Sequence, residues 1–450
     1  MDLLSGNIKK IYFKYLFAAF GSAMITSIYS IVDMAMVGQY HGPDGTAALA
    51  VVAPVWNIIY SLGLLMGIGG SVILVTKKAS DNDGKENQYF TIAVIGAIIL
   101  SILSWSAFIL FEDEILTFFG ADSSLLGYAT TYLKPIMYVL PLFLFNQMLA
   151  AFLRNDNDPL LATIGVLSGG IFNVFGDYFF VFVCDLGILG AGIATAVGAV
   201  ISFVVMLTHF LKKKNTLKFI KCEDFFSKMR EVVITGFPTF FIDVAMGIVT
   251  VLFNRQIMNY LDANALSVYG PIINVSTFVQ CCAYSVGQAA QPIISPNFGA
   301  NKWDRIKETL HYGLLTAAFF GIFWTVLSMV APNMYIYLFM TPNSEILQIA
   351  PSIIRTYAIS FLLLPFNIFS TYYFQAIMKP KQAFIVSFAR GLLISGLLIT
   401  LLPKFFGGTS IWLAMPITEL LTMFYGAICI KKYTLSNEER SNKLKVKHAH

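Results

Sequence analysis

Residues 212–230 read KKKNTLKFIKCEDFFSKMR and form the longest basic break between apolar segments of a 450-residue chain. Seven residues of this stretch are Lys or Arg, whereas 57% of the whole chain is hydrophobic and only 12% is charged. The mean hydropathy is +0.71, a value that a water-soluble globular protein of this length would not show. The sequence therefore predicts an integral membrane protein that this basic segment divides in two.

Twelve apolar segments are long enough to cross a bilayer, which takes about 20 residues of α-helix. They lie near 11–38, 47–75, 88–111, 128–153, 160–183, 188–211, 232–258, 264–295, 306–331, 350–378, 383–403 and 409–430. The breaks between them are short, which is typical of an α-helical bundle. We predict an all-α integral membrane protein of twelve transmembrane helices with six helices on each side of the basic segment.

Basic residues indicate the orientation of these helices. Of the 30 Lys and Arg residues, 25 lie in the N-terminal segment, the breaks after even-numbered helices, or the C-terminal tail. The breaks after odd-numbered helices contain only Lys404. This bias predicts a multi-pass protein of the plasma membrane with both termini in the cytoplasm. The formal charge of +5 then suits contact with anionic lipid rather than with nucleic acid.

An internal repeat supports the division into halves. LAVVAPVWN at 49–57 aligns with LSVYGPIIN at 266–274, 217 residues later, and Pro159 matches Pro380 at an offset of 221. Because each half has an even number of helices, the two halves run parallel, as in transporters with a binding cavity between two lobes. The predicted domains are an N-lobe at 1–211, a linker at 212–230, a C-lobe at 231–433 and a basic tail at 434–450.

Four acidic residues fall well inside predicted spans: Asp33, Asp177, Asp243 and Glu419. Each costs at least about 2.5 kcal/mol if it is unpaired near mid-membrane, so a function or a partner is expected. Asp33 and Asp177 lie at a common depth, near the outer ends of outward-running helices. Asn173, Thr195 and Tyr132 are expected at a comparable depth, with Asn173 on the same helix face as Asp177. This group could take up and release a proton, or its oxygens could bind Na⁺ instead.

The other two acidic residues differ in their expected partners. Arg390 lies at a similar depth to Glu419 on the preceding helix, which predicts a structural ion pair. Asp243 follows Pro238 by five residues and has no basic residue at its depth, which makes it an acidic candidate of the second lobe. The five Cys and five His residues are scattered, so the sequence predicts neither a disulfide framework nor a zinc site.

Four stretches resemble the MATE (multidrug and toxic compound extrusion) family. They are SIVDMAMVGQY at 30–40, LGAGIATAVG at 189–198, GQAAQPIISPNFGANKWDRIKETL at 287–310 and IWLAMPITELL at 411–421. The segment from Gln291 to Ala300 is the most specific and is most similar to the bacterial DinF-like and MepA-like branch. The resemblance implies two six-helix lobes around a V-shaped cavity and export of amphipathic, often cationic compounds in exchange for H⁺ or Na⁺.

The resemblance also implies a cation site in the first lobe, at Asp33, Asn173, Asp177 and Thr195, with Tyr132 as a fifth member. This is the same group that helix depth selects. In two places the chain departs from the family pattern. Ala18 stands where relatives have a helix-1 proline, and the tenth span has no acidic residue while Asp243 is offset from its expected place. The resemblance therefore does not support cation coupling through the second lobe.

The predicted mechanism is antiport in which a cation and a drug favour opposite states of the protein. The drug cavity is expected to be lined by polar, aromatic and Met side chains, which adapt to varied apolar ligands. The candidates are Asn57, Asn146, Met246, Asn274, Phe278, Gln280 and Tyr284. We expect a monomer that needs no cofactor beyond the coupling ion.

Three other functions remain open from the sequence. A flippase for lipid-linked saccharides would be expected to show about fourteen helices and several basic residues in its cavity. An exporter of a narrow set of metabolites is a second alternative, because a polyspecific cavity leaves little pattern in a single sequence. An intramembrane prenyl transferase would need Asp-rich motifs for Mg²⁺ and diphosphate, and NVFGD at 173–177 alone does not provide them.

Overall fold

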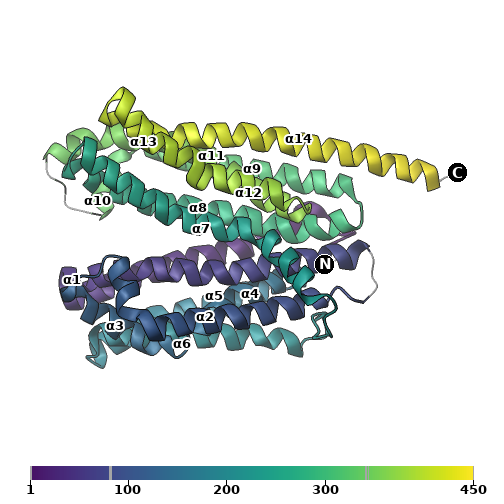
Figure 1. The fold of residues 1–450 in the computed structure, drawn as a ribbon, viewed down its shortest axis with the longest axis horizontal. Helices are drawn as coiled ribbons and strands as arrows, with labels where there is room; N and C mark the ends of the chain where they lie inside the picture. The colour runs from purple at the N-terminus through teal and green to yellow at the C-terminus, as the bar shows by residue number, and fades with distance from the viewer. Residues whose placement is uncertain (1–2, 81–83, 340–341, 343, 449–450) are drawn as a thin grey trace. The chain divides into compact units, whose positions relative to one another are not determined.

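A computed structural model describes residues 3–80, 84–339, 342 and 344–448, and over these ranges the chain is helical without any strand. It forms two compact units: the N-unit, Phe17–Phe240, and the C-unit, which joins Met1–Leu16 to Phe241–His450. Figure 1 shows the helices of each unit running side by side. This arrangement confirms the predicted all-α fold class.

The helices of the N-unit begin with α1 (Ile8–Ser80), whose first residues belong to the C-unit, and end within α7. They are α2 (Gln88–Phe118), α3 (Ser123–Met137), α4 (Leu140–Asn155), α5 (Pro159–Asp177), the π-helix η1 (Tyr178–Val183), α6 (Gly187–Leu207), the 3₁₀-helix η2 (Thr208–Leu211) and α7 (Phe225–Tyr260). The rest of α7 and all later helices belong to the C-unit. Those are α8 (Ala263–Gly299), α9 (Trp303–Val330), α10 (Pro332–Phe339), α11 (Ser344–Ala376), α12 (Pro380–Phe388), the π-helix η3 (Ala389–Leu393), α13 (Ile394–Phe406), the 3₁₀-helix η4 (Gly408–Leu413) and α14 (Ala414–His448).

Eleven helices of the described chain are long and apolar enough to span a membrane, or twelve if one bent pair counts as a single span. The bent pair is α3 and α4, which meet at an angle of 62°. The span predicted near 128–153 therefore consists of two helices with a bend between them. Pro135 removes a hydrogen bond near the end of α3, and Pro141 starts a new helix in the first turn of α4.

The first two predicted spans both lie in α1. Its helical backbone is interrupted at Gly42, where φ is 69° and ψ is −151°. This conformation lies outside the regions open to residues with a side chain, and glycine adopts it without strain. A single glycine therefore separates two spans for which the sequence predicts a loop at 39–46.

The N-unit extends past the predicted linker. Asn87 donates from Nδ2 to the carbonyl of Thr216 at 3.2 Å, and Tyr89 donates to Glu231 at 2.6 Å. A Cβ on Gly236 would lie 2.0 Å from the carbonyl oxygen of Leu65, so the first turns of α7 pack directly on α1. The compact units consequently divide between Phe240 and Phe241, later in the chain than the expected linker at 212–230.

The C-unit is built around α11, which contacts α8, α9, α12 and α14. Its apolar core includes Phe369, Tyr373 and Phe374 of α11 together with residues of α8 and α9. Tyr12, at the start of α1, joins this core and hydrogen-bonds Thr316 of α9 at 2.5 Å.

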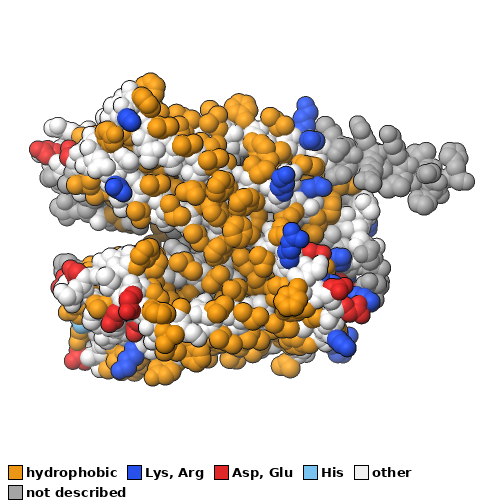
Figure 2. Space-filling model, viewed as in Figure 1, with side chains coloured by type: hydrophobic (Ala, Val, Ile, Leu, Met, Phe, Trp, Pro, Cys, Tyr) orange, Lys and Arg blue, Asp and Glu red, His pale blue; other side chains and the backbone are white. Residues whose placement is uncertain are grey.

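The surface of each unit suits a bilayer. Figure 2 shows apolar side chains covering the middle of the visible face of each unit, while charged side chains gather toward its ends. Many of the exposed side chains along the helices are large and hydrophobic, for example Leu110, Phe175 and Phe319. Such surfaces are stable only where lipid covers them.

Candidate functional site

Five polar residues meet inside the N-unit, and we call them the polar cluster: Asp33, Tyr132, Asn173, Asp177 and Thr195. They come from α1, α3, α5 and α6, and each is at most 8% exposed. Tyr132 Oη donates to Asp33 Oδ2 at 2.7 Å and lies 3.4 Å from Thr195 Oγ1. Asn173 Nδ2 donates to Thr195 Oγ1 at 3.0 Å. Hydrogen bonds thus connect four of the five residues that the sequence selected, and the fifth, Asp177, lies close enough to Asp33 for their charges to interact.

Asp177 is the least satisfied member of the cluster. It is 0% exposed, and within the described residues neither of its carboxylate oxygens has a hydrogen-bond partner. Asp33 Oδ1 and Asn173 Oδ1 also lack a partner there. Buried polar atoms are nearly always hydrogen-bonded, so four unpaired oxygens in one cluster mark it as a candidate binding site.

The donor set of the cluster consists of carboxylate, amide and hydroxyl oxygens. Such hard donors suit a proton or a hard cation such as Na⁺, and they do not suit a transition metal. In the part of the chain that the structure describes, no group of three or more His, Cys, Asp and Glu side chains is placed to hold a metal ion.

Small residues allow the cluster to form. A Cβ on Gly192 would lie 2.2 Å from the carbonyl oxygen of Tyr132, so only glycine lets α6 approach α3 this closely. At the end of α5, Asp177 is followed at once by η1, and π-turns of this kind frequently occur at functional sites. The close contact between α6 and α3 lets the hydroxyls of Tyr132 and Thr195 approach to 3.4 Å.

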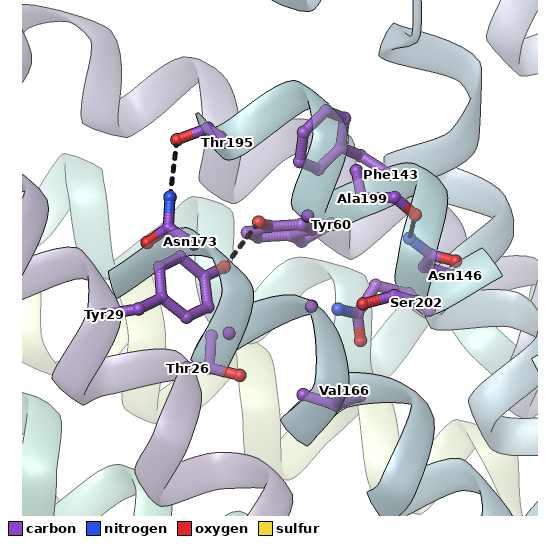
Figure 3. A pocket seen from close by; sticks show the side chains of 14 residues that line it. Thr26, Tyr29, Tyr60, Phe143, Asn146, Val166, Asn173, Thr195, Ala199 and Ser202 are labelled. Atoms are coloured by element: carbon purple, nitrogen blue, oxygen red, sulfur yellow. Dashed lines mark hydrogen bonds between the residues drawn. The ribbon is translucent and has the colours of Figure 1, made fainter. Parts of the chain in front are cut away.

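A pocket in the N-unit adjoins the polar cluster, and Asn173 and Thr195 line it (Figure 3). Tyr29 and Tyr60 face it and hydrogen-bond each other at 2.9 Å. Asn146, a predicted cavity residue, also lines this pocket and donates to the carbonyl of Ala199 at 3.0 Å. A ligand in the N-unit pocket would therefore lie beside the cluster.

A second pocket lies in the C-unit, and two more predicted cavity residues, Met246 and Gln280, line it. The other four candidates, Asn57, Asn274, Phe278 and Tyr284, line neither of these pockets. Asn57 and Asn274 are exposed, and Phe278 is partly buried. The seven predicted cavity residues are therefore spread over both units, and they do not share one of these pockets.

The other two acidic residues of the predicted spans, Asp243 and Glu419, both accept hydrogen bonds. Asp243 accepts a hydrogen bond from Tyr284 Oη at 2.7 Å, so a tyrosine hydroxyl takes the place of the missing basic residue. Arg390 Nε donates to Glu419 Oε1 at 2.7 Å, and Asn367 Nδ2 donates to Glu419 Oε2 at 2.6 Å. The structure thus brings Arg390 and Glu419 together as expected and adds Asn367.

Sequence reasoning missed two groups of residues. Tyr29 lies four residues before Asp33 on α1, and this spacing could have placed it on the same helix face. A buried His209 lies between Asp156 Oδ2, at 2.7 Å, and Asp158 Oδ2, at 3.1 Å. Nothing in the spacing of these three residues connects them, because the α4–α5 turn and the end of α6 meet only in the folded protein.

Known proteins match most of this chain. A model of the MatE family matches residues 18–179 and again residues 238–399, so one pattern occurs in both halves of the chain. The multidrug export protein MepA of Staphylococcus haemolyticus is 25% identical, with 92% of this chain and 91% of that protein covered. MepA of Staphylococcus saprophyticus is 23% identical, with 89% and 88% covered.

Solved structures show the same fold. An outward-facing multidrug resistance MATE family transporter of the MOP superfamily superposes with a TM-score of 0.86 at 19% identity, and 98% of each chain is covered. A MATE crystal structure in a bent conformation gives a TM-score of 0.88 at 18% identity, again over 98% of each chain. A MOP superfamily transporter from Pyrococcus furiosus gives 0.86 at 19% identity and 98% coverage of both.

Proposed function

The chain belongs to the MatE family, and from this premise we propose that it is a multidrug efflux antiporter. It exports amphipathic, often cationic compounds in exchange for H⁺ or Na⁺ through alternating access. Family membership makes it a multi-pass membrane transporter and not an enzyme, which removes the prenyl transferase considered above. Export of drugs is the activity for which its MepA relatives are named.

The observation that carries the proposal is the fully buried carboxylate of Asp177, which has no hydrogen-bond partner among the described residues. A carboxylate in that state is costly unless a cation neutralises it, and intramembrane carboxylates mark ion and proton pathways. Asp33 supplies a second carboxylate, and the hydroxyls of Tyr132 and Thr195 complete the cluster. Together these groups bind the coupling cation.

Coupling follows from the position of the N-unit pocket. Asn173 and Thr195 belong to both the pocket and the cluster, so a drug and a cation compete for the same side chains. If the cation favours one conformation and the drug another, each lowers the affinity for the other by the same factor. A membrane potential of 100 mV then contributes about 2.3 kcal/mol for each proton that enters.

The proposal extends to orientation and surroundings. Both termini lie in the cytoplasm, and the basic segment at 212–230 faces anionic lipid of the inner leaflet of the plasma membrane. The transporter works as a monomer and requires only its coupling ion. Its partners are the bilayer and small amphipathic substrates.

Dye transport in proteoliposomes tests the proposal. Export of a fluorescent cationic dye is measured under an imposed pH gradient and, separately, under an imposed sodium gradient. We expect one gradient to drive transport and Asp177→Asn to lower the gradient-driven rate at least about tenfold, because the amide keeps the side-chain volume but binds neither a proton nor Na⁺ comparably. The gradient that works identifies the ion.

The matched control is Asp44→Asn, which removes an exposed carboxylate of α1 outside the polar cluster. It should transport at the wild-type rate. Equal transport by Asp177→Asn and wild type would remove Asp177 as the coupling residue. No transport of dye under either gradient would instead favour a flippase or an exporter of a narrow set of metabolites.

A further inference from the structure

The C-unit pocket contains a charged donor group that the cation-coupling mechanism does not use. Arg390 lines this pocket, and its side chain is only 9% exposed. Among the described residues its guanidinium makes one hydrogen bond, from Nε to Glu419 Oε1 at 2.7 Å. A guanidinium has five N–H donors, so the terminal Nη1 and Nη2 groups keep their donors for a ligand.

The partners of Arg390 hold the guanidinium in place. Glu419 is 0% exposed, and its second oxygen, Oε2, accepts from Asn367 Nδ2 at 2.6 Å. Both carboxylate oxygens are therefore occupied, and Glu419 orients Arg390 through Nε alone. This geometry leaves the Nη1–Nη2 edge, a planar fork that matches a carboxylate in two parallel hydrogen bonds.

A local change of helical pitch brings Arg390 to the pocket. It lies in η3, and the next residue is Gly391, where a Cβ would come within 2.5 Å of Ala245 Cβ on α7. Because η3 packs this closely on α7, Arg390 lines the same pocket as Met246 and Thr250 of that helix.

The internal repeat shows that the two pockets correspond in position. The two family matches begin 220 residues apart (238 − 18). Near these starting points the spacing makes Thr26 correspond to Met246, and each of the two lines the pocket of its own unit.

A second correspondence changes the chemistry of the pocket. At the offset of 221 that aligns Pro159 with Pro380, Gly169 corresponds to Arg390 and Gly170 to Gly391, and each of these four residues lines the pocket of its own unit. No Lys or Arg is among the described residues that line the N-unit pocket. The repeat has therefore kept the place of the pocket and replaced a glycine by a cationic donor.

We propose that the C-unit pocket binds amphipathic aromatic compounds that carry a carboxylate, which accepts hydrogen bonds from the Nη1–Nη2 edge of Arg390. The aromatic body of the ligand lies against Tyr269 and Tyr357 and the side chains of Met246 and Met415, all of which line the pocket. Glu419 already balances the charge of Arg390. The preference for a ligand with a carboxylate therefore comes from the hydrogen bonds that Nη1 and Nη2 donate to it, and not from net charge. This inference names a substrate class for the proposed export function and in that respect rests on it.

A matched pair of dyes tests the inference. Rhodamine 110 has a free carboxylate, and rhodamine 123 is its methyl ester with the same aromatic body. Binding of each dye to the full-length protein in detergent at pH 7 is measured by fluorescence polarisation. We expect Arg390→Lys to weaken rhodamine 110 binding about tenfold and to change rhodamine 123 binding less than twofold, because lysine keeps the ion pair with Glu419 but not the planar fork.

Two further variants complete the design. Met246→Phe narrows the C-unit pocket without touching Arg390 or Glu419, and it should weaken rhodamine 110 at least about fivefold even if Arg390→Lys does not fold. Thr26→Met makes the corresponding change in the N-unit pocket and should leave the ratio of the two affinities unchanged. The inference is overturned if either Arg390→Lys or Met246→Phe binds rhodamine 110 as wild type does, or if both dyes weaken equally in Arg390→Lys.

The binding measurement uses no ion gradient, so it separates this inference from the antiport proposal. Asp177→Asn should keep the wild-type ratio of rhodamine 110 to rhodamine 123 affinity while losing gradient-driven export. Wild-type affinity for rhodamine 110 in Arg390→Lys, together with gradient-driven export by the wild-type protein, would overturn the inference alone.

Discussion

Asp158 shows how a buried carboxylate is stabilised at the edge of the membrane-spanning helices. Lys214 Nζ lies 2.7 Å from its Oδ1, while Lys212 Nζ and His209 Nδ1 lie 3.0 and 3.1 Å from Oδ2. Burial alone would raise the pKa of Asp158, but hydrogen bonds from Lys214, Lys212 and His209 hold that pKa below its usual range. The carboxylate therefore joins the turn between α4 and α5 to the basic segment after η2.

This depressed pKa predicts a pH dependence of stability. A carboxyl group with a lower pKa in the folded state stabilises the protein above its unfolded pKa, about 4, and that stability is lost as the pH falls through the folded pKa. We expect Asp158→Asn to unfold at a lower temperature than wild type at pH 7, with the difference shrinking as the pH falls from about 5 to 3. Thermal unfolding in detergent over a pH series measures both effects.

Asp113→Asn serves as the control because Asp113 is exposed. Its unfolding temperature should follow that of wild type throughout the series. A difference between wild type and Asp158→Asn that stays constant from pH 7 to pH 3 would show that the carboxylate does not act through its charge.

Single residues of the polar cluster were predictable because burial of a charge in lipid is so costly. Asp33 and Asp177 stand out in apolar runs, and counting residues from the helix ends places Tyr132 and Thr195 beside them. The hydrogen-bond partners of Glu419 were only half predictable. Arg390 is a charged residue at a matching depth, whereas Asn367 is one of several polar side chains in α11 and becomes a partner only when α11 packs on α14.

The packing of α6 against α3 leads to a prediction about these two helices. A Cβ on Gly192 would lie 2.2 Å from the carbonyl oxygen of Tyr132 and 2.8 Å from Pro135 Cγ. Gly192→Ala must push the helices apart, and overpacking of this kind typically costs about 1–3 kcal/mol. Because Tyr132 is displaced from Asp33, we expect both a lower unfolding temperature and a lower rate of dye export.

Gly127→Ala is the matched control on α3, since no atom lies within 4 Å of the Cβ that it would add. Alanine favours a helix by about 1 kcal/mol over glycine, so this variant should be as stable as wild type or more so. Wild-type stability and export in Gly192→Ala would mean that the close approach of α6 does not position the cluster.

Helix boundaries were less predictable than the presence of the helices. Hydropathy gives the length of an apolar segment but not whether its helix axis bends. The only sequence features that accompany the 62° bend between α3 and α4 are Pro135 and Pro141. The two π-helices were also not predicted from the sequence. η1 directly follows Asp177, and η3 contains Arg390. A π-turn depends on local packing, which the apolar pattern of a span does not encode.

The two halves of the chain were predicted from weak sequence identity, and their common family pattern supports that prediction. The compact units nevertheless exchange segments, since the first sixteen residues of the chain join the C-unit and the first turns of α7 join the N-unit. Apolar contacts decide this exchange: Ile11, Tyr12 and Tyr15 pack into the C-unit core. Sequence reasoning divided the chain at its charged break because charge, and not packing, was visible there.

The direction in which the chain crosses the membrane gives a prediction that tests the positive-inside bias. Cys184 follows η1 at the end of an outward-running helix and is exposed, so it should lie on the outer side. Lys213 is exposed in the basic segment and should lie in the cytoplasm.

Labelling of single cysteines in intact cells tests this orientation. In the first variant Cys184 is the only cysteine, because alanine replaces Cys222, Cys281, Cys282 and Cys429. A membrane-impermeant maleimide should label this variant in intact cells. A second chain with Lys213→Cys as its only cysteine should be labelled only after the membrane is opened, and a cysteine-free chain should stay unlabelled. The reverse pattern would mean that the N-terminus lies outside, and that a cation entering down its gradient would reach the polar cluster from the side with the basic segments.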